Sequence, residues 1–388
     1  MTMHDVGLPA RDDLSPSRAE VYARVHAFDR PTLVLDVDRV EHNFDALQAG
    51  LGDAHIHYAV KANPAREIIE RLVQVGSHFD AASRGEIELC LSQGARAETI
   101  SFGNTVKRPS DIAFAYEAGV TLFAADAEEE LQKIAENAPG AGVYIRLIVE
   151  NSQADWPLSR KFGCHGEMAL ALLDRAKELG LDPAGFSFHV GSQTRRSEMW
   201  GPVLDQVLAV WAAAHEAGHK LRLLNIGGGF PAFYGEVIEP ATAYAAGVMR
   251  QVRARFGDVL VMAEPGRGMV ADAGVIAAEV LLVSRKSANE LHRWVYLDIG
   301  KFSGLAETMD EAIRYQFATP RDHEAMGPCI LAGPSCDSAD VLYEKKMVSL
   351  PVGLTAGDRV VIRNCGAYTS SYSSVGFNGF PPLDVCVI

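Results

Sequence analysis

The stretch HIHYAVKANP, residues 55–64, decides how this chain folds. An apolar, strand-like run ends at Lys61, and Ala62-Asn63-Pro64 then turns the chain. Because a lysine that closes a buried strand cannot easily reach water, we expect a lowered pKa and a neutral, nucleophilic amine. Such an amine condenses with an aldehyde. The alternative is a lysine that marks the solvated end of a core strand.

Short apolar runs of the same kind alternate with helix-length stretches from about residue 36 to residue 265. A first helix is predicted over 37–51, where apolar residues recur at three- and four-residue steps. Strands are predicted near residues 55–60, 78–81, 99–102, 120–124, 142–149, 186–190, 222–226 and 259–263. Eight such units predict an α/β fold, a (β/α)₈ barrel of the TIM type.

The chain changes character after Gly274. One helix is predicted over 307–315, and strands are predicted over 275–283, 294–297, 358–362, 383–388 and, from the amino end, 31–35. We therefore expect three parts: a segment of residues 1–35 that contributes to the β domain, a barrel over 36–270, and a mostly β domain over 271–388. The irregular stretch 150–165 is predicted to be a mobile loop near a site.

Composition narrows the possible functions. The 36 basic and 50 acidic residues give a net charge of −14, which repels nucleic acid and anionic membranes. Neither a signal peptide nor a membrane-spanning run is visible, so a cytoplasmic location is expected. The six cysteines and twelve histidines show no C-x-x-C or H-E-x-x-H spacing, and no phosphate-binding G-x-x-x-x-G-K-[ST] loop occurs. No metal or nucleotide site is predicted.

Polar residues stand at the predicted carboxyl ends of the barrel strands, where the active groups of such barrels lie. They are Lys61, Asp80, Arg146, His189, Gly227-Gly228-Gly229 and Glu264. The three glycines can let backbone N–H groups approach a phosphate closely, with help from Gly266 and Arg267. They can equally form only a flexible turn.

Two of these side chains suit a flat cofactor that withdraws electrons. Glu264 can pair with a protonated pyridine nitrogen, and His189 can stack on the ring. Each also has a simpler interpretation, as an exposed carboxylate and as a core histidine. Asp80 and Arg146 can equally form a structural ion pair. Together with a nucleophilic lysine, the set meets the requirements of pyridoxal 5'-phosphate.

The motifs of the chain resemble those of the alanine-racemase-like, fold-type III pyridoxal-phosphate enzymes, and within them the ornithine/diaminopimelate/arginine decarboxylase family. The chain looks most like the bacterial ornithine decarboxylases. Matching stretches follow the family's order over nearly the whole chain: residues 58–64 (YAVKANP), 79–83 (FDAAS), 159–163 (SRKFG), 189–192 (HVGS), 227–231 (GGGFP), 264–267 (EPGR), 333–338 (GPSCDS), 366–369 (GAYT) and 377–380 (FNGF).

The resemblance implies a role for each matching residue. Lys61 would carry pyridoxal 5'-phosphate as a Schiff base, Glu264 would bind the pyridine nitrogen, and His189 would stack on the ring. The residues that would hold the phosphate are Ser192, Gly229, Gly266, Arg267 and Tyr368. Those that would support the site are Asp80, Glu86 and Arg146.

In this family the active sites lie at a homodimer interface, and the resemblance implies that the opposite subunit supplies Cys336 and Asp337. Cys336 would return a proton to the substrate carbon after carbon dioxide leaves, and Asp337 would bind the distal ammonium of a diamino acid. Without the resemblance, Cys336 would be interpreted as a buried apolar residue.

The substrate is suggested by residues on which the family divides. Diaminopimelate enzymes carry glutamate after the cysteine and tyrosine at the position of Phe377, whereas Cys336-Asp337 and Phe377-Asn378 follow the ornithine side. This implies decarboxylation of L-ornithine to putrescine and carbon dioxide, with L-lysine, which would give cadaverine, as a second substrate. Glu307 and Asp310 can bind the second amine, or can simply be acidic residues in the first turn of a helix.

Three alternatives remain. The chain can be a lysine-preferring decarboxylase of the same family, or a non-catalytic homologue that binds pyridoxal phosphate or another protein. Inactive relatives would be expected to lose Lys61 or Cys336, and both are present. An amino-acid racemase would need a second base opposite the lysine, and Cys336-Asp337 favours decarboxylation instead.

Overall fold

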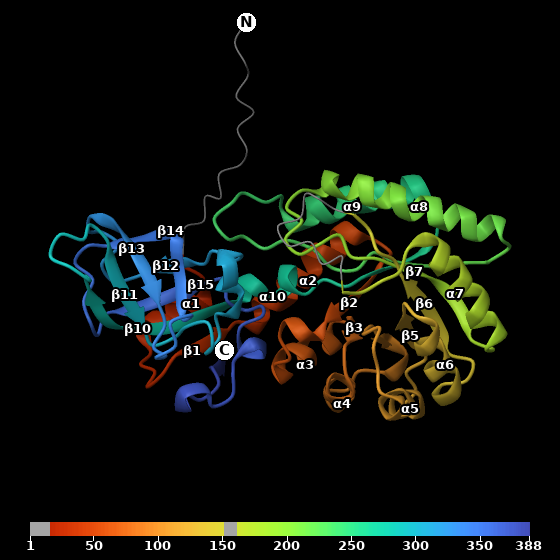
Figure 1. Ribbon diagram of the computed structural model, residues 1–388, viewed down its shortest axis with the longest axis horizontal. Helices are drawn as coiled ribbons and strands as arrows, with labels where there is room; N and C mark the ends of the chain where they lie inside the picture. The colour runs from red at the N-terminus through yellow and green to blue at the C-terminus, as the bar shows by residue number, and fades with distance from the viewer. Residues whose placement is uncertain (1–15, 151–160) are drawn as a thin grey trace, which may run out of the picture.

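Eight parallel strands close into a barrel in one half of the molecule (Figure 1). The structure is a computed structural model that describes residues 16–150 and 161–388. The barrel strands follow one another around the barrel in sequence order, which confirms the predicted (β/α)₈ fold. They are β2 (His55–Ala59), β3 (His78–Ala81), β4 (Ile100–Phe102), β5 (Leu122–Ala125), β6 (Gly142–Arg146), β7 (Asp182–Ser187), β8 (Leu223–Asn225) and β9 (Leu260–Ala263).

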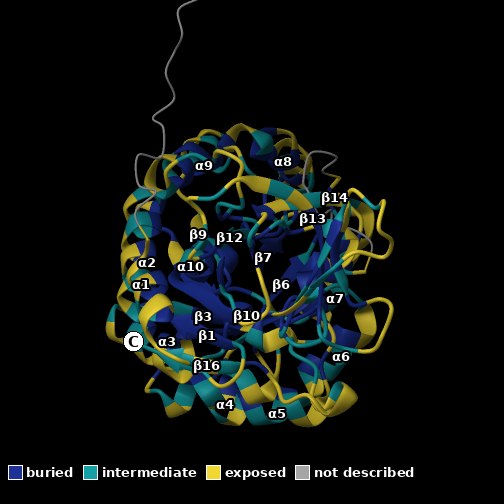
Figure 2. Cartoon of the chain, turned by 90° about the vertical axis from the view of Figure 1, so that its left-hand side faces the viewer, coloured by how far each residue is buried: buried dark blue, intermediate teal, exposed yellow. Residues whose placement is uncertain are grey.

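Helices cover the outside of the barrel, each with an apolar face against the strands (Figure 1). Helix α2 (Val37–Leu51) buries Val40, Phe44 and Leu47, as its sequence spacing predicts, and Asp36 caps its first turn. Figure 2 shows buried strands inside and helices of mixed exposure outside. The other barrel helices are α3 (Arg66–Gln74), α4 (Arg84–Ser92), α5 (Pro109–Glu117), α6 (Glu128–Asn137), α7 (Gly166–Glu178), α8 (Gly201–Glu216) and α9 (Ala241–Phe256). The short helix α10 (Arg267–Val270) lies between the barrel and the β domain (Figure 1).

The second half of the molecule is a mostly antiparallel sheet, as predicted (Figure 1). Strand β1 (Thr32–Leu35), from the amino end, completes it by pairing with β10 and β16. The remaining strands are β10 (Gly274–Ser284), β11 (Arg293–Leu297), β12 (Gln316–Ala318), β13 (Met326–Ala332), β14 (Val341–Pro351), β15 (Arg359–Arg363) and β16 (Asp384–Val387). Helix α1 (Arg18–Val25) covers part of one face, where Ala19 and Ala23 pack with Val34 and Val275.

Several elements differ from the sequence predictions. The helix predicted over 307–315 is wrong: Ala306–Glu311 forms only a short 3₁₀ segment, broken at Asp310, where φ is 52°. Strands β12, β13 and β14 were not predicted. Strand β13 was missed because it contains Pro328, and proline seldom occurs inside a sheet. Strand β14 was missed because the exposed residues Glu344-Lys345-Lys346 interrupt its apolar pattern.

The predicted mobile loop over 150–165 lies largely outside the described residues, and only its two ends are seen. Leu147 and Cys164, close to those ends, form an isolated parallel β-bridge. None of the described helices combines the length and the apolar character that crossing a bilayer requires.

Candidate active site

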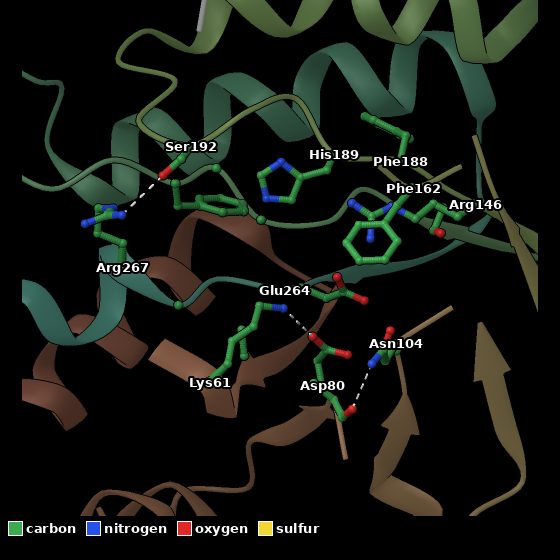
Figure 3. A pocket seen from close by; sticks show the side chains of 18 of the residues that line it. Lys61, Asp80, Asn104, Arg146, Phe162, Phe188, His189, Ser192, Glu264 and Arg267 are labelled. Atoms are coloured by element: carbon green, nitrogen blue, oxygen red, sulfur yellow. Dashed lines mark hydrogen bonds and ion pairs between the residues drawn. The ribbon is translucent and has the colours of Figure 1, made fainter. Parts of the chain in front are cut away.

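A cavity of about 580 Å³ lies at the carboxyl ends of the barrel strands (Figure 3). Glu86 stands behind its wall, where its carboxylate accepts a hydrogen bond from the Ala82 N–H at 2.6 Å. The residues singled out by the sequence that line the cavity are Lys61, Asp80, Arg146, His189, Ser192, Gly229, Glu264, Gly266, Arg267, Glu307 and Tyr368. Those outside the lining are Asp310, Cys336, Asp337 and Phe377.

Lys61 stands in a 3₁₀ turn, Val60–Ala62, directly after β2. Its Nζ lies 3.2 Å from Oδ2 of Asp80 on the adjacent strand β3 (Figure 3). Burial is the largest single effect and lowers the pKa of Lys61, but the charges of Asp80, Tyr368 and Glu264 together outweigh it and raise this pKa above the usual lysine value. The predicted lowering is therefore wrong, because the side chain is 51% exposed towards the cavity and has a carboxylate beside it.

Asp80 is held in the wall by a close fit with the next strand. A Cβ on Gly103, just after β4, would lie 1.9 Å from Oδ1 of Asp80, so a larger residue cannot stand there without moving the carboxylate. Oδ2 meets Lys61, and Oδ1 is buried without a hydrogen-bond partner among the described residues. Since an unpaired buried oxygen is costly, Oδ1 of Asp80 is available to accept a hydrogen bond from a further donor.

Glu264 follows β9 and accepts a hydrogen bond from the side-chain amide of Asn225 at the end of β8. Burial and the nearby charge of Asp80 raise the pKa of Glu264 to about 7. This carboxyl group can therefore hold a proton near neutral pH and share it with a basic ring nitrogen.

Replacing Glu264 by glutamine should change how the stability of the cofactor-free protein depends on pH. With a folded pKa of about 7 against an ordinary value of 4.5, the folded chain binds the extra proton between these pH values. This contribution to stability is present below pH 4.5 and is lost as pH rises through 7, on the order of 1 kcal/mol per pH unit. Urea unfolding across this window should show the loss in the wild type and not in Glu264→Gln, and identical pH profiles would contradict the assignment.

His189 follows β7 and is fixed as a neutral ring. The backbone N–H of Gly191 donates to its Nδ1 at 2.9 Å, which places the ring proton on Nε2. Burial, together with the positive charges of Arg146 and Lys61, lowers the pKa of His189 to about 3. A neutral, oriented imidazole with one face towards the cavity can stack on a planar ring.

Glycine backbone forms one end of the cavity. Gly227 and Gly229 have φ values of 68° and 99°, which favour glycine. A Cβ on Gly229 would lie 2.5 Å from the carbonyl oxygen of Gly191. On Gly266, a Cβ would lie 2.9 Å from the Cβ of Ala62. These loops can approach each other this closely only because the residues are glycines. Backbone N–H groups at the cavity wall are then available to bind an anion.

Arg267 provides a positive charge at the glycine-rich end of the cavity. Its guanidinium forms a buried two-point ion pair with Glu307, with N···O distances of 2.6 and 2.5 Å, and its Cζ lies 4.9 Å from the ring centre of Tyr368. A long contact of 3.4 Å joins it to Ser192 Oγ, and Nε has no hydrogen-bond partner among the described residues. Glu307 thus faces the anion-binding end of the cavity.

The remaining predicted residues gather on the surface of the β domain. Cys336 is exposed, and both its N–H and its Sγ approach Oδ1 of Asn378, at 3.2 and 3.5 Å. Phe377 packs against Phe302, with ring centres 4.5 Å apart. Asp337 is exposed beside Cys336 and accepts a hydrogen bond from the Ala339 N–H. Cys336 is therefore not a buried residue.

The sequence did not single out several residues of the site. Tyr144 lines the cavity from inside the barrel, with its hydroxyl next to Ser101, and Asn104 and Asn225 stand at strand ends. Both asparagines could have been found by the rule that identified Asp80. Tyr144 could not have been found in this way, because in the sequence it is indistinguishable from an ordinary buried aromatic residue of strand β6. Phe162 and Tyr372 complete the wall, and Phe162 lies 5.1 Å below the guanidinium of Arg146.

Residues 37–271 match the family model "Pyridoxal-dependent decarboxylase, pyridoxal binding domain", which covers more than half of the chain. The chain belongs to this family. The resemblance seen in its motifs is confirmed, and its cofactor is pyridoxal 5'-phosphate.

Relatives of known activity match over nearly their whole length. A lysine/ornithine decarboxylase of Selenomonas ruminantium is 34% identical over 368 residues, which is 94% of this chain and 91% of that protein. The structure of a Vibrio vulnificus lysine/ornithine decarboxylase with cadaverine is 32% identical, with a TM-score of 0.85 over 96% of this chain and all of the other. A Paramecium bursaria Chlorella virus arginine decarboxylase bound to agmatine is 28% identical, with a TM-score of 0.85 over 95% and 99% of the chains. The chain is thus a pyridoxal-dependent amino-acid decarboxylase.

The cavity fits this cofactor at both ends. Lys61 offers an amine that can bind the aldehyde, and Glu264 can hold the proton of the ring nitrogen. The glycine loops line the place for a phosphate, and Arg267, whose buried Nε has no hydrogen-bond partner among the described residues, lines the cavity beside them. Asp80 Oδ1, also unpartnered, stands on the Lys61 side.

Proposed function

We propose that the protein converts L-ornithine to putrescine and carbon dioxide. The observation that carries this proposal is the pairing of Cys336 with Asp337 on an exposed surface next to Phe377 and Asn378. A thiol can deliver a proton, and a neighbouring carboxylate can bind a terminal ammonium, which a purely apolar pocket could not do. The relatives that act on ornithine and lysine support the same substrate class.

The residues of the cavity divide the work of such a reaction. Pyridoxal phosphate supplies an electron sink for the pair left when carbon dioxide departs. Glu264 keeps a proton at the ring nitrogen, and neutral His189 presents its flat face to the ring. Asp80 accepts a hydrogen bond from the ammonium of Lys61 at 3.2 Å and would hold this side chain towards the cofactor in the cavity.

We further propose that the active protein is a homodimer with shared sites. Cys336 and Asp337 lie outside the cavity that Lys61 lines, yet they are exposed and so can reach another molecule. In a symmetric dimer, the partner subunit's Cys336 and the partner subunit's Asp337 would close each cavity. A monomer would then lack both the proton donor and the ammonium anchor, and would be inactive.

A substrate panel tests the function. Purified protein with pyridoxal phosphate would be incubated with ornithine, lysine, arginine and diaminopimelate, followed by measurement of carbon dioxide and identification of the amine. The proposal requires putrescine from ornithine as the main product. Turnover of diaminopimelate alone, or of no substrate, would reject it.

Lysine is a second candidate substrate. Glu307 lines the cavity, whereas Asp310 is exposed outside it. Of the two, we therefore propose Glu307 as the carboxylate that would bind the terminal ammonium of lysine. A phosphate bound to Arg267 would compete with Glu307 for the guanidinium and weaken the ion pair. Cadaverine formation in the same panel, reduced in Glu307→Gln, would support this role.

Replacing Asp337 by asparagine should weaken ornithine binding. Removing a charge-assisted hydrogen bond costs about 1.5–3 kcal/mol, so kcat/KM for ornithine should fall about 10- to 100-fold. Steady-state kinetics measure this, and Glu344→Gln, an exposed carboxylate on β14 of the same domain, serves as the control. If both variants keep wild-type kcat/KM, Asp337 does not bind the distal amine.

A further inference from the structure

Three histidines gather at the amino-terminal end of the barrel. His55 and His57 lie two residues apart on β2, and His78 opens β3 opposite His57 in the parallel register. Alternate residues of a strand share a face, so His55 and His57 point the same way as Ala59, which lines the active-site cavity. His78 likewise shares its face with Asp80. All three rings therefore face the barrel interior, below the site that contains Lys61.

This cluster is unusual for the interior of such a barrel, which bulky apolar residues normally fill. Apolar residues of this kind do pack together here: Ala124, Tyr144, Ala184, Leu223 and Met262 form one buried hydrophobic cluster. In contrast, one ring nitrogen from each of the three histidines lies within 4.8 Å of the other two. His57 is buried and His55 is exposed, so the cluster extends from the interior to the solvent.

The rings are suited to act as ligands. Burial, together with the neighbouring His78, lowers the pKa of His57 well below its usual value. Burial, with His55 and Arg96, lowers the pKa of His78 to about 4. Both rings are therefore neutral at pH 7 and offer a lone pair.

The surroundings of the cluster are mixed in charge. Arg96 is mostly exposed and pairs with Glu98 at 3.4 Å, and the Asp53 carboxylate lies close enough to His55 to interact with it electrostatically. Nδ1 of His57 lies 3.5 Å from Ser101 Oγ on β4, which orients the ring and leaves Nε2 as the nitrogen for an ion.

We propose that His55, His57 and His78 bind one Zn²⁺ ion, with water as the fourth ligand. Tetrahedral Zn²⁺ bonds to imidazole nitrogens at about 2.0–2.1 Å, which places the nitrogens about 3.4 Å apart. From separations of up to 4.8 Å, the ligand atoms need only a small approach, which rotation of the exposed His55 side chain can largely supply. Zn²⁺ is favoured over Mg²⁺ or Ca²⁺ because all three ligands are imidazoles rather than oxygens.

The bound ion would tie together the two strands that carry the catalytic lysine and its partner. Lys61 follows the carboxyl end of β2, and Asp80 lies near the carboxyl end of β3. An ion that binds only the folded chain stabilises it by mass action, so Zn²⁺ should raise the melting temperature. The site takes no part in the decarboxylation and does not depend on the proposed substrate.

Metal titration of the holoenzyme tests this proposal. A Cys336→Ser background removes the exposed thiol as a competing ligand. Calorimetry with Zn²⁺, and visible ligand-field absorption with Co²⁺ in its place, should show one ion per chain. His55→Ala and His78→Asn should lose this ion and its effect on the melting temperature.

The matched control is His42→Ala, which removes an exposed histidine from α2 and should leave the bound ion in place. His55 is also exposed, so its replacement should leave the folded barrel intact, as the melting temperature without metal will show. Absence of a bound ion in the parent protein, or equal Zn²⁺ binding by His55→Ala and His42→Ala, would overturn the proposal and leave the three rings as core histidines.

Discussion

Replacing Lys61 by alanine should abolish amine production, with a fall in kcat of at least about 10⁴-fold. The amine of Lys61 points into the cavity between the ends of β2 and β3, where Asp80 holds it at 3.2 Å. The covalent role towards an aldehyde requires an amine at this position, so loss of the Lys61 side chain removes the reaction rather than weakening it. Carbon dioxide release from ornithine measures the effect.

The visible absorbance of the purified protein gives a second measurement for the same variant. The band that a lysine-bound pyridoxal group produces should disappear in Lys61→Ala. Lys161→Ala is the matched control, because Lys161 is the other lysine among the residues that line the cavity. It should retain the band. A Lys61→Ala protein that still forms putrescine at near the wild-type rate would refute the assignment.

Two inactive variants should restore activity when their subunits are mixed. Cys336→Ala should lower the rate of correct amine formation by about 10²- to 10⁴-fold, the usual effect of a positioned proton donor, while the cofactor stays bound. Lys61→Ala should be inactive for a different reason. In a heterodimer of the two, one site combines an intact Lys61 with the partner subunit's intact Cys336.

If the sites are shared, random exchange of subunits should recover about a quarter of wild-type activity. The control mixture is Lys61→Ala with Glu264→Ala. Both of these residues line the same subunit's cavity, so every site in the heterodimer remains defective. Activity in the first mixture that does not exceed the sum of its two components would show that each subunit works alone.

The geometry of a parallel barrel explains why much of the site could be predicted. Its strands all end at one rim, so Lys61, Asp80, His189 and Glu264, which are far apart in the sequence, had to meet there. The same rule applied to β4 would have added Asn104. What a strand-end rule cannot give is the distance between side chains.

That limit explains the error over Lys61. Its sequence context suggested burial alone, but nearby negative groups, Asp80 first among them, raise its pKa, and the 3.2 Å contact with Asp80 depends on the register of β2 against β3. The histidine cluster was missed for the same reason. His55 and His78 are separated by most of a β/α unit and show no ligand spacing until the two strands pair.

The β domain was harder to predict because its pairing is not repetitive. Its sheet joins β10 to β15, and β1 from the amino end to β16, across long intervals of sequence. The Glu307 region formed no helix, since Asp310 and Glu311 both adopt positive φ. The sequence allowed Glu307 to be proposed as a site residue. Its ion pair with Arg267 could not be predicted from the sequence.

The central claim is that Lys61 carries the cofactor, and chemical trapping tests it most directly. The holoprotein would be reduced with borohydride, which makes the imine linkage permanent, then digested and analysed by mass spectrometry. The account predicts the added pyridoxyl phosphate mass on the peptide that contains Lys61 and on no other peptide. An unmodified Lys61 peptide together with a label on another lysine would contradict it.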